Sequence, residues 1–211
     1  MKKIVIFGAS GKTGLLLTSE ALAAGYEVIA YVRSAESVKL VHKNLKVVVG
    51  QLSDKETLTS VIRGSDACIS TLGGASITKH SHEIMAGIDT IVSIMEAENV
   101  KRLIYLSSIG VGDSRNYMPQ PIRFLVVDLM LRVPMADHNR NENRIANSQL
   151  QFTIVRPGGL TEGPKTDHLK HGSERIKLKG NSSVSRSNVA AFLLDQVTNT
   201  DYLNKMVWLR E

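Results

Sequence analysis

Near its N-terminus the chain reads Lys3-Ile-Val-Ile-Phe-Gly8-Ala-Ser-Gly11-Lys-Thr-Gly14. The four apolar residues from Ile4 to Phe7 predict a buried strand, and an apolar helical pattern begins at Leu15. The glycines between them recur at every third position, which differs from the standard dinucleotide fingerprint and from a P-loop. A strand that passes through such a turn into a helix is typical of nucleotide-phosphate sites, because glycine permits close backbone approach and the helix N-terminus offers free N–H groups. The alternative is a strand-to-helix turn that holds no ligand.

Strand-like and helix-like segments alternate along the rest of the chain. We expect strands at 27–32, 46–49, 67–72, 102–106, 152–155, 175–179 and 205–209, and helices at 13–24, 55–62, 78–98, 136–147 and 187–197. Strands separated by helices imply parallel β-α-β units, so we predict an α/β fold with a Rossmann-type doubly wound parallel sheet in a single domain. The ligand of such a sheet lies beyond the carboxyl ends of its strands. For the apolar segment 122–133, core packing is the default expectation, against a lid over a pocket or a subunit contact.

Length, composition and charge limit the possible classes. The 211 residues suffice for one domain, and 43% hydrophobic with 22% charged residues is ordinary for a soluble globular protein. The single cysteine, Cys68, excludes an internal disulfide, and its apolar neighbours favour a core position over a reactive thiol. We see no signal peptide and no run long enough for a membrane span, so we expect a cytoplasmic protein. The net charge of +6, without a dense basic block, favours a solvated basic surface over a nucleic-acid site.

The end of the second expected strand indicates which cofactor would be selected. An acidic residue at this place accepts hydrogen bonds from the adenosine ribose and selects NAD, but this chain has Arg33 followed by Ser34. A guanidinium can pair with a 2′-phosphate and stack on adenine, and Lys12 in the glycine turn adds a second cation. We therefore expect NADP(H) in preference to NAD(H). The alternative is a solvated charge at the end of the strand.

Several longer motifs resemble those of atypical short-chain dehydrogenases/reductases with an NAD(P)H-binding domain, in particular the biliverdin-IXβ reductase/flavin reductase and NmrA-like groups. The resemblance covers about residues 3–198 and is carried by the glycine turn with these further stretches: Gly25-Tyr-Glu-Val-Ile-Ala-Tyr-Val-Arg33, Val49-Gly50-Gln51-Leu52-Ser53-Asp54, Ser70-Thr-Leu-Gly73-Gly74, Leu106-Ser107-Ser108, Asp137-His138 and Thr153-Ile-Val-Arg-Pro157-Gly158-Gly159. It implies one NAD(P)-binding domain over 1–211, with a small substrate-side portion at about 157–186.

The resemblance also implies where the cofactor would lie. Its pyrophosphate would lie on the glycine turn, and its 2′-phosphate on Arg33 and Ser34. The adenine would lie between Gln51 and Leu52, although relatives often carry Asp at the position of Gln51. The cofactor-binding residues expected on this basis are Gly8, Ser10, Gly11, Lys12, Thr13, Gly14, Arg33, Ser34, Gln51, Leu52, Thr71, Leu72, Gly73, Ser107, Pro157, Gly158 and Gly159.

The usual acid–base pair of the family is missing. Ordinary short-chain dehydrogenases use Tyr-x-x-x-Lys, and this chain contains no such pattern; the family register places Pro134 and His138 at the two positions. Ser108 and His138 remain as the candidate catalytic residues, with His138 as a ribose ligand or a proton donor. The alternative for His138 is a surface position on a polar helix. Hydride transfer to a conjugated acceptor needs less acid catalysis, because the protein then contributes mainly proximity and orientation.

Histidines at 80 and 82 followed by Glu83 resemble a metal motif only weakly, because side chains two residues apart on a helix diverge. We therefore predict no metal site.

Two functions fit the sequence. The first is an NADPH-dependent reductase of a conjugated small molecule such as a flavin, a quinone or a tetrapyrrole-like compound. The second is a non-catalytic NADP(H)-binding redox sensor of the NmrA-like type, acting through a protein partner. We expect a monomer or a homodimer with a small-molecule acceptor, and neither a membrane nor a nucleic acid as partner.

Overall fold

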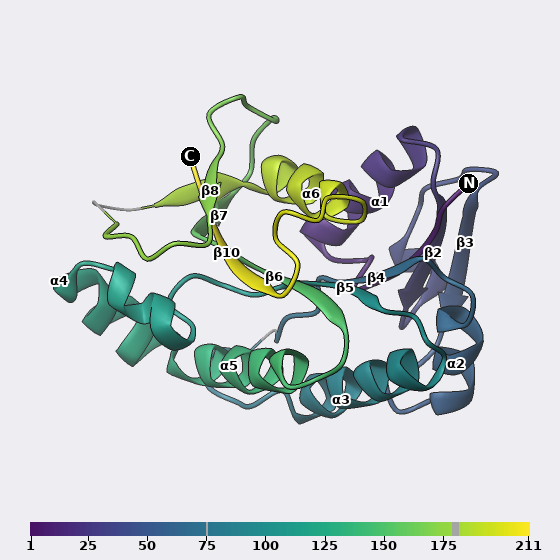
Figure 1. Cartoon of the computed structure of the whole chain (residues 1–211), viewed down its shortest axis with the longest axis horizontal. Helices are drawn as coiled ribbons and strands as arrows, with labels where there is room; N and C mark the ends of the chain where they lie inside the picture. Colours follow the sequence, from purple (N-terminus) through teal and green to yellow (C-terminus); the bar gives the residue numbers. More distant parts are fainter. Residues whose placement is uncertain (75, 179–181) are drawn as a thin grey trace.

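The computed structural model describes residues 1–74, 76–178 and 182–211 and confirms the predicted fold class. Its centre is an eight-stranded sheet in the order β3-β2-β1-β4-β5-β6-β10-β8 (Figure 1). All neighbouring strands in this sheet run parallel except β8, which pairs antiparallel with β10 at the edge. The strands are β1 (Lys3–Phe7), β2 (Glu27–Val32), β3 (Leu45–Val49), β4 (Ala67–Ser70), β5 (Arg102–Leu106), β6 (Gln151–Pro157), β8 (Lys170–Gly172) and β10 (Lys205–Arg210).

Helices cover both faces of the sheet. On one face lie α1 (Lys12–Ala23) and α6 (Arg186–Asp195), and on the other lie α2 (Lys55–Ile62), α3 (His82–Ala97) and α5 (Arg132–Ala146) (Figure 1). Alternating side chains of the buried strands feed the two cores: Ile4 and Ile6 pack towards α1 and α6, while Val5 and Phe7 pack towards α2 and α3. The near-continuous apolar runs of the central strands follow from this burial on both faces.

The strand order reverses direction at β1, which lies between β2 and β4. In an open parallel sheet, this reversal leaves a crevice beyond the carboxyl ends of the strands. The turn after β1 and the segment after β4 meet there, since the Thr71 N–H donates to the Phe7 carbonyl at 2.9 Å. The glycine turn identified in the sequence therefore lies at the edge where a ligand of this fold is expected.

Two expectations about the second half of the chain are wrong. Segment 175–178 forms no strand, and Lys179 lies outside the described residues; the antiparallel edge strand is β8 instead. Core packing of 122–133 is also wrong for most of its side chains: Phe124 is 60% and Leu129 66% exposed, and Val127 is the buried residue of η3, the π-helical segment Arg123–Met130.

Smaller elements complete the described chain. A short pair of parallel strands, β7 (Gly159–Thr161) and β9 (Ser183–Ser185), follows the end of β6, and short helical turns η1 (Ala35–Ser37), η2 (Gly112–Tyr117) and α4 (Gln120–Ile122) lie in connections. Within the described ranges, every helix falls short of the length and apolar character that a membrane crossing needs.

Candidate functional site

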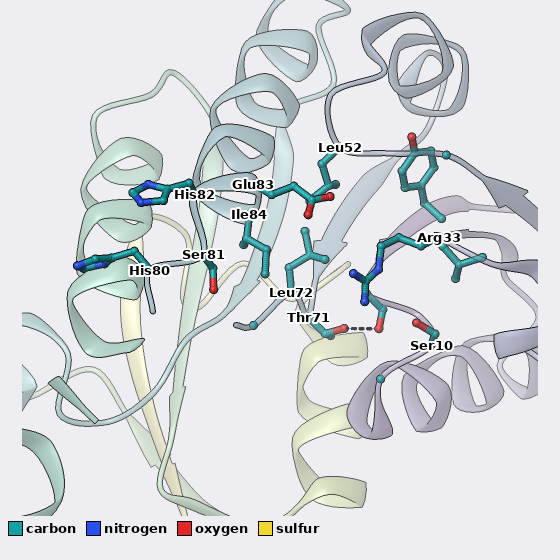
Figure 2. Close-up of a pocket in the computed structure, with 16 residues that line it drawn as sticks. Ser10, Arg33, Leu52, Thr71, Leu72, His80, Ser81, His82, Glu83 and Ile84 are labelled. Carbon is teal, nitrogen blue, oxygen red and sulfur yellow. Dashed lines mark hydrogen bonds between the residues drawn. The ribbon is translucent and has the colours of Figure 1, made fainter. Parts of the chain in front are cut away.

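The glycine turn between β1 and α1 is so tight that side chains would not fit at Gly8 or Gly14. Gly8 has a φ of +80°, and a Cβ there would lie 2.9 Å from the Thr71 Oγ1. A Cβ on Gly14 would collide with the Gly8 carbonyl oxygen. The turn is closed by the Gly11 N–H, which donates to the Gly8 carbonyl at 3.0 Å, and by Thr71 Oγ1, which donates to the same carbonyl (Figure 2).

Helix α1 begins with its backbone donors free. Gly11 occupies its N-cap and has no side chain to accept from the first turn, and the first turn, all of it described, carries no acidic residue. Unpaired N–H groups at a helix start give a positive potential that attracts anions. The turn and the start of α1 together therefore offer a site for a phosphate group.

A cavity opens beside this turn. Its volume of about 570 Å³ is within the range typical of cofactor sites. It lies at the carboxyl ends of β1, β2 and β4, and Figure 2 shows that its labelled residues come from several connections. Eight of the residues expected from the sequence line it: Gly8, Ser10, Gly11, Arg33, Leu52, Thr71, Leu72 and Gly73.

Arg33 is the exposed cation of this cavity. Its side chain extends from the end of β2 into the space between Ser10 and Leu72 (Figure 2). Among residues 1–74, 76–178 and 182–211, no carboxylate forms an ion pair with Arg33, whereas Lys12 is bound to Glu162 at 2.9 Å on the surface. Arg33 is thus available to an anionic ligand, and Lys12 is already partnered.

The far wall of the cavity was missed by sequence reasoning. It is formed by the residues before and at the start of α3: His80, Ser81, His82, Glu83 and Ile84. This helix begins at residue 82, whereas the sequence suggested 78, so the polar run before it forms a wall of the cavity instead of a first helical turn. Across the described residues, no cluster of three His, Cys, Asp or Glu side chains is arranged to hold a metal ion.

Asp137 of α5 ties this wall to the neighbouring helix. One carboxylate oxygen pairs with His80 Nδ1 at 2.5 Å, and the other accepts from the Ser81 N–H at 2.7 Å. Burial would raise the pKa of Asp137, but these hydrogen bonds hold it below its usual range. These two hydrogen bonds therefore fix the position of the segment that closes the cavity.

A smaller cavity of about 70 Å³ adjoins the large one. Leu72, Gly73, Ser81 and Ile84 line both, so the two cavities are neighbours. His138 lies in the wall of the smaller cavity together with Tyr105, Pro134 and Asn141. Burial lowers the pKa of His138 to about 4, although the Asp137 charge works in the opposite direction, so the imidazole is neutral at pH 7.

The remaining expected residues lie outside both cavities. The Ser108 hydroxyl donates to the Ile109 carbonyl, and Ser107 is buried with its hydroxyl on Glu142. Gln51 and Ser34 are exposed, and the Gln51 carbonyl accepts from the Tyr31 hydroxyl. The others in this group are Thr13 and Gly14, buried in α1, and Pro157, Gly158 and Gly159 at the end of β6.

A buried ionic network surrounds Glu142 of α5. Glu142 of α5 accepts from Arg156 Nη2 at 2.6 Å and Nε at 3.0 Å, and from the Ser107 hydroxyl at 2.5 Å. Arg156 also reaches Asp113 at 2.7 Å. This network joins α5 to the ends of β5 and β6, and it sets the position of His138 one helical turn before Glu142.

The comparisons with known proteins agree with this geometry. A family model described as NAD(P)H-binding matches residues 8–200. The chain belongs to this NAD(P)H-binding family. Pinoresinol reductase 2 of Arabidopsis thaliana is 30% identical over 99% of this chain and 68% of that protein.

Solved structures show the same fold. ChuY, an anaerobilin reductase from Escherichia coli O157:H7, has a TM-score of 0.82 at 24% identity, with 100% of this chain and 97% of that one covered. A short-chain dehydrogenase/reductase from Veillonella parvula, solved in complex with NADP, also has a TM-score of 0.82, at 19% identity over 100% of this chain and 94% of that one.

The two α5 positions at which the resemblance places the acid–base pair hold Pro134 and His138. Pro134 and His138 both line the smaller cavity, and the sequence offers no Tyr-x-x-x-Lys pair elsewhere. His138 lines the smaller cavity and also forms a hydrogen bond with Tyr105, a residue of β5.

Proposed function

We propose that this protein is an NADPH-dependent oxidoreductase of the atypical short-chain dehydrogenase type, which reduces a conjugated small molecule such as a flavin, a quinone or a tetrapyrrole-like compound. The observation that carries the proposal is Arg33, a cation without a carboxylate partner among the described residues, in a cavity that begins at the glycine turn. A bidentate guanidinium suits a 2′-phosphate, which NADPH has and NADH lacks.

The residues present fit a dinucleotide. Glycine at positions 8 and 14 lets the turn fold tightly against Thr71 and against itself, and such a turn lets the backbone come close to a pyrophosphate. Gly8, Ser10 and Gly11 with the start of α1 would hold the pyrophosphate, and Arg33 with Ser34 the 2′-phosphate. Leu52 offers an apolar contact for the adenine, and Thr71, Leu72 and Gly73 would line the path towards the smaller cavity.

When bound, NADPH would supply the hydride. The chain itself has the tasks of binding, orienting and excluding water, which suffice for an acceptor whose conjugation spreads the incoming charge. The neutral imidazole of His138 at the smaller cavity can donate a hydrogen bond there but carries no readily released proton at pH 7. Reduction without a strong protein acid favours conjugated acceptors over simple carbonyl compounds.

The relatives support a reductase of small molecules. Both pinoresinol reductase 2 and ChuY carry reductase in their names, and the Veillonella parvula structure holds NADP. The names of the two reductases give different acceptors, so they support a reductase without indicating its substrate.

The test is NADPH oxidation by the purified protein with FMN, several quinones and biliverdin as acceptors. We expect turnover above the solution background for at least one acceptor, and little or none with NADH at the same concentration. Absence of turnover with all of them would contradict the reductase proposal.

The missing Tyr-x-x-x-Lys pair favours a redox sensor as the second candidate. This function predicts tight NADP(H) binding without turnover, and a protein partner whose affinity differs between the NADPH-bound and NADP⁺-bound forms. Equal partner affinity with NADPH, with NADP⁺ and without cofactor would exclude it.

A further inference from the structure

A chain of hydrogen bonds ends at His138 and determines which of its nitrogens carries the proton. Asn141 Nδ2 donates to the Tyr105 hydroxyl at 3.1 Å, and the same hydroxyl lies 2.9 Å from His138 Nδ1. A second contact agrees with this orientation of the Asn141 amide, because Arg140, which can only donate, approaches Asn141 Oδ1 at 3.4 Å. The amide nitrogen therefore faces Tyr105.

The direction of the second bond follows from the first. The Tyr105 side chain is fully buried, and its oxygen already accepts a proton from Asn141. Its own O–H then has His138 Nδ1 as acceptor, so Nδ1 is unprotonated and Nε2 carries the hydrogen. The opposite tautomer, with Nδ1–H donating to Tyr105, would leave a buried hydroxyl proton with no acceptor among the described residues, which is unfavourable.

We infer that Tyr105 and Asn141 are positioning residues that lock His138 as a neutral imidazole with its Nε2–H directed to a ligand oxygen in the smaller cavity. This inference deepens the proposed function. It rests on the proposed function only for the identity of the ligand. Within the described chain, Nε2 has no hydrogen-bond partner of its own, while His138 lines the cavity. Because the buried Tyr105 holds the imidazole in place, the Nε2–H donor is already oriented before the ligand arrives.

The size of the smaller cavity limits what can enter. Its volume of about 70 Å³ matches roughly two water molecules, so it suits a polar end group of a larger molecule. An amide, carbonyl or hydroxyl oxygen has the acceptor lone pairs that an imidazole N–H needs. Because the two cavities share part of their lining, this oxygen belongs to a molecule whose body occupies the large cavity: either the nicotinamide dinucleotide itself or the acceptor bound beside it.

The tautomer can be measured without any ligand by long-range ¹H–¹⁵N NMR on the imidazole rings, with the His138 signals assigned from the spectrum of His138→Gln. We expect the Nε2–H tautomer for His138 in the wild-type protein at pH 7. An Nδ1–H tautomer or an imidazolium would overturn the inference and leave the proposed reductase function untouched.

Tyr105→Phe removes the hydroxyl and keeps the ring. We expect the His138 signals to move to those of a mixture of tautomers, since nothing then selects one ring nitrogen. Tyr202→Phe is the matched control, because the Tyr202 hydroxyl lies 2.8 Å from His171 Nδ1 in a Tyr–His pair that lines neither cavity. It should leave the His138 signals unchanged. An unchanged His138 tautomer in folded Tyr105→Phe would contradict the positioning role.

Ligand contact is tested by titrating NADP⁺ alone, and then FMN in the presence of NADP⁺. A shift of the His138 Nε2 signal with NADP⁺ alone assigns the oxygen to the dinucleotide, and a shift only with FMN assigns it to the acceptor. If binding is seen by calorimetry but neither addition moves Nε2, the ligand contact is wrong. If NADP⁺ does not bind at all, the proposed function fails while the measured tautomer still stands.

Substitutions of His138 can distinguish a role as hydrogen-bond donor from a role in packing alone. His138→Gln retains an N–H near the position of Nε2, whereas His138→Leu keeps similar bulk without a donor. We expect the leucine variant to lose about 100-fold in kcat and the glutamine variant to retain activity within about tenfold of wild type. Equal loss in both folded variants would contradict the donor role.

Discussion

At the scale of the residue, the site depends on where charge is left unpaired and where it is buried. Arg33 lies in the open cavity without a carboxylate partner among the described residues, whereas Arg156 is buried and bound by Glu142 and Asp113. The first arrangement leaves the charge for a ligand, and the second uses it to hold the fold together. His138 lies between these cases: it is neutral and positioned by Tyr105.

The depressed pKa of His138 makes folding stability depend on pH. In the folded protein its pKa is about 4, against about 6.5 unfolded, so between these values the unfolded chain binds more protons. Stability is therefore complete above about pH 6.5 and falls as the pH drops towards 4. We expect the wild type to lose about 2 kcal/mol more than His138→Gln between pH 7.5 and pH 5, because glutamine does not titrate. Urea unfolding at both pH values measures the difference, and parallel losses in the two proteins would contradict it.

At the scale of the element, the ends of β5 and β6 are held to α5 by the network around Glu142. The Glu142 side chain is 2% exposed and pairs with Arg156, whose side chain is 5% exposed. Glu142 matters for folding stability mainly because its removal would leave the buried charge of Arg156 uncompensated.

Glu142→Leu should therefore destabilise the protein by about 3–5 kcal/mol, because Arg156 would remain buried with only the half-exposed Asp113 as partner. The double variant Glu142→Leu/Arg156→Leu should recover much of this loss, since two apolar residues can replace a buried pair. Urea unfolding of the three proteins tests this. Glu98→Gln, which breaks a surface pair with Arg63, is the control and should have a far smaller effect. A double variant no more stable than Glu142→Leu would argue against the mechanism.

The elements also show how far the sequence could predict the structure. The strands at 27–32 and 102–106 and the helix at 55–62 have the predicted bounds, because their apolar patterns are set by burial in this sheet and its cores. β8 was not predicted, since Lys170–Gly172 is a three-residue edge strand with little apolar character. The exposed apolar side chains of η3 could not be told from core residues, because composition alone does not show which face a segment buries.

For the site, the sequence predicted those residues that directly follow strand ends. The glycine turn, Arg33 and the Thr71-Leu72-Gly73 stretch follow strand ends and meet at the cavity. The wall at His80 and Ser81 was missed because its position depends on Asp137, more than fifty residues away. The Tyr105–His138 pair is likewise a contact between a strand and a later helix, which no local pattern indicates.

At the scale of the whole molecule, the reversal of strand order at β1 brings these parts together. The glycine turn and Arg33 lie beyond the ends of β1 and β2, and the segment before α3 follows β4 on the opposite side of the cavity (Figures 1 and 2). The smaller cavity continues from there to α5 and β5. The layout leads from the glycine turn and Arg33 to the neutral imidazole of His138, and this order matches the dinucleotide position that we propose.

The most direct test of this account is the affinity of the purified protein for NADPH and for NADH, measured by calorimetry in the wild type and in Arg33→Ala. Because a charged hydrogen bond to the 2′-phosphate is available only to NADPH, we predict that the wild type binds NADPH roughly ten- to 100-fold more tightly than NADH. Arg33→Ala should remove this difference and leave NADH binding nearly unchanged, while Arg63→Ala, at an exposed arginine outside the cavity, should preserve it. Equal binding of the two dinucleotides by the wild type, or an unchanged preference in Arg33→Ala, would contradict the account.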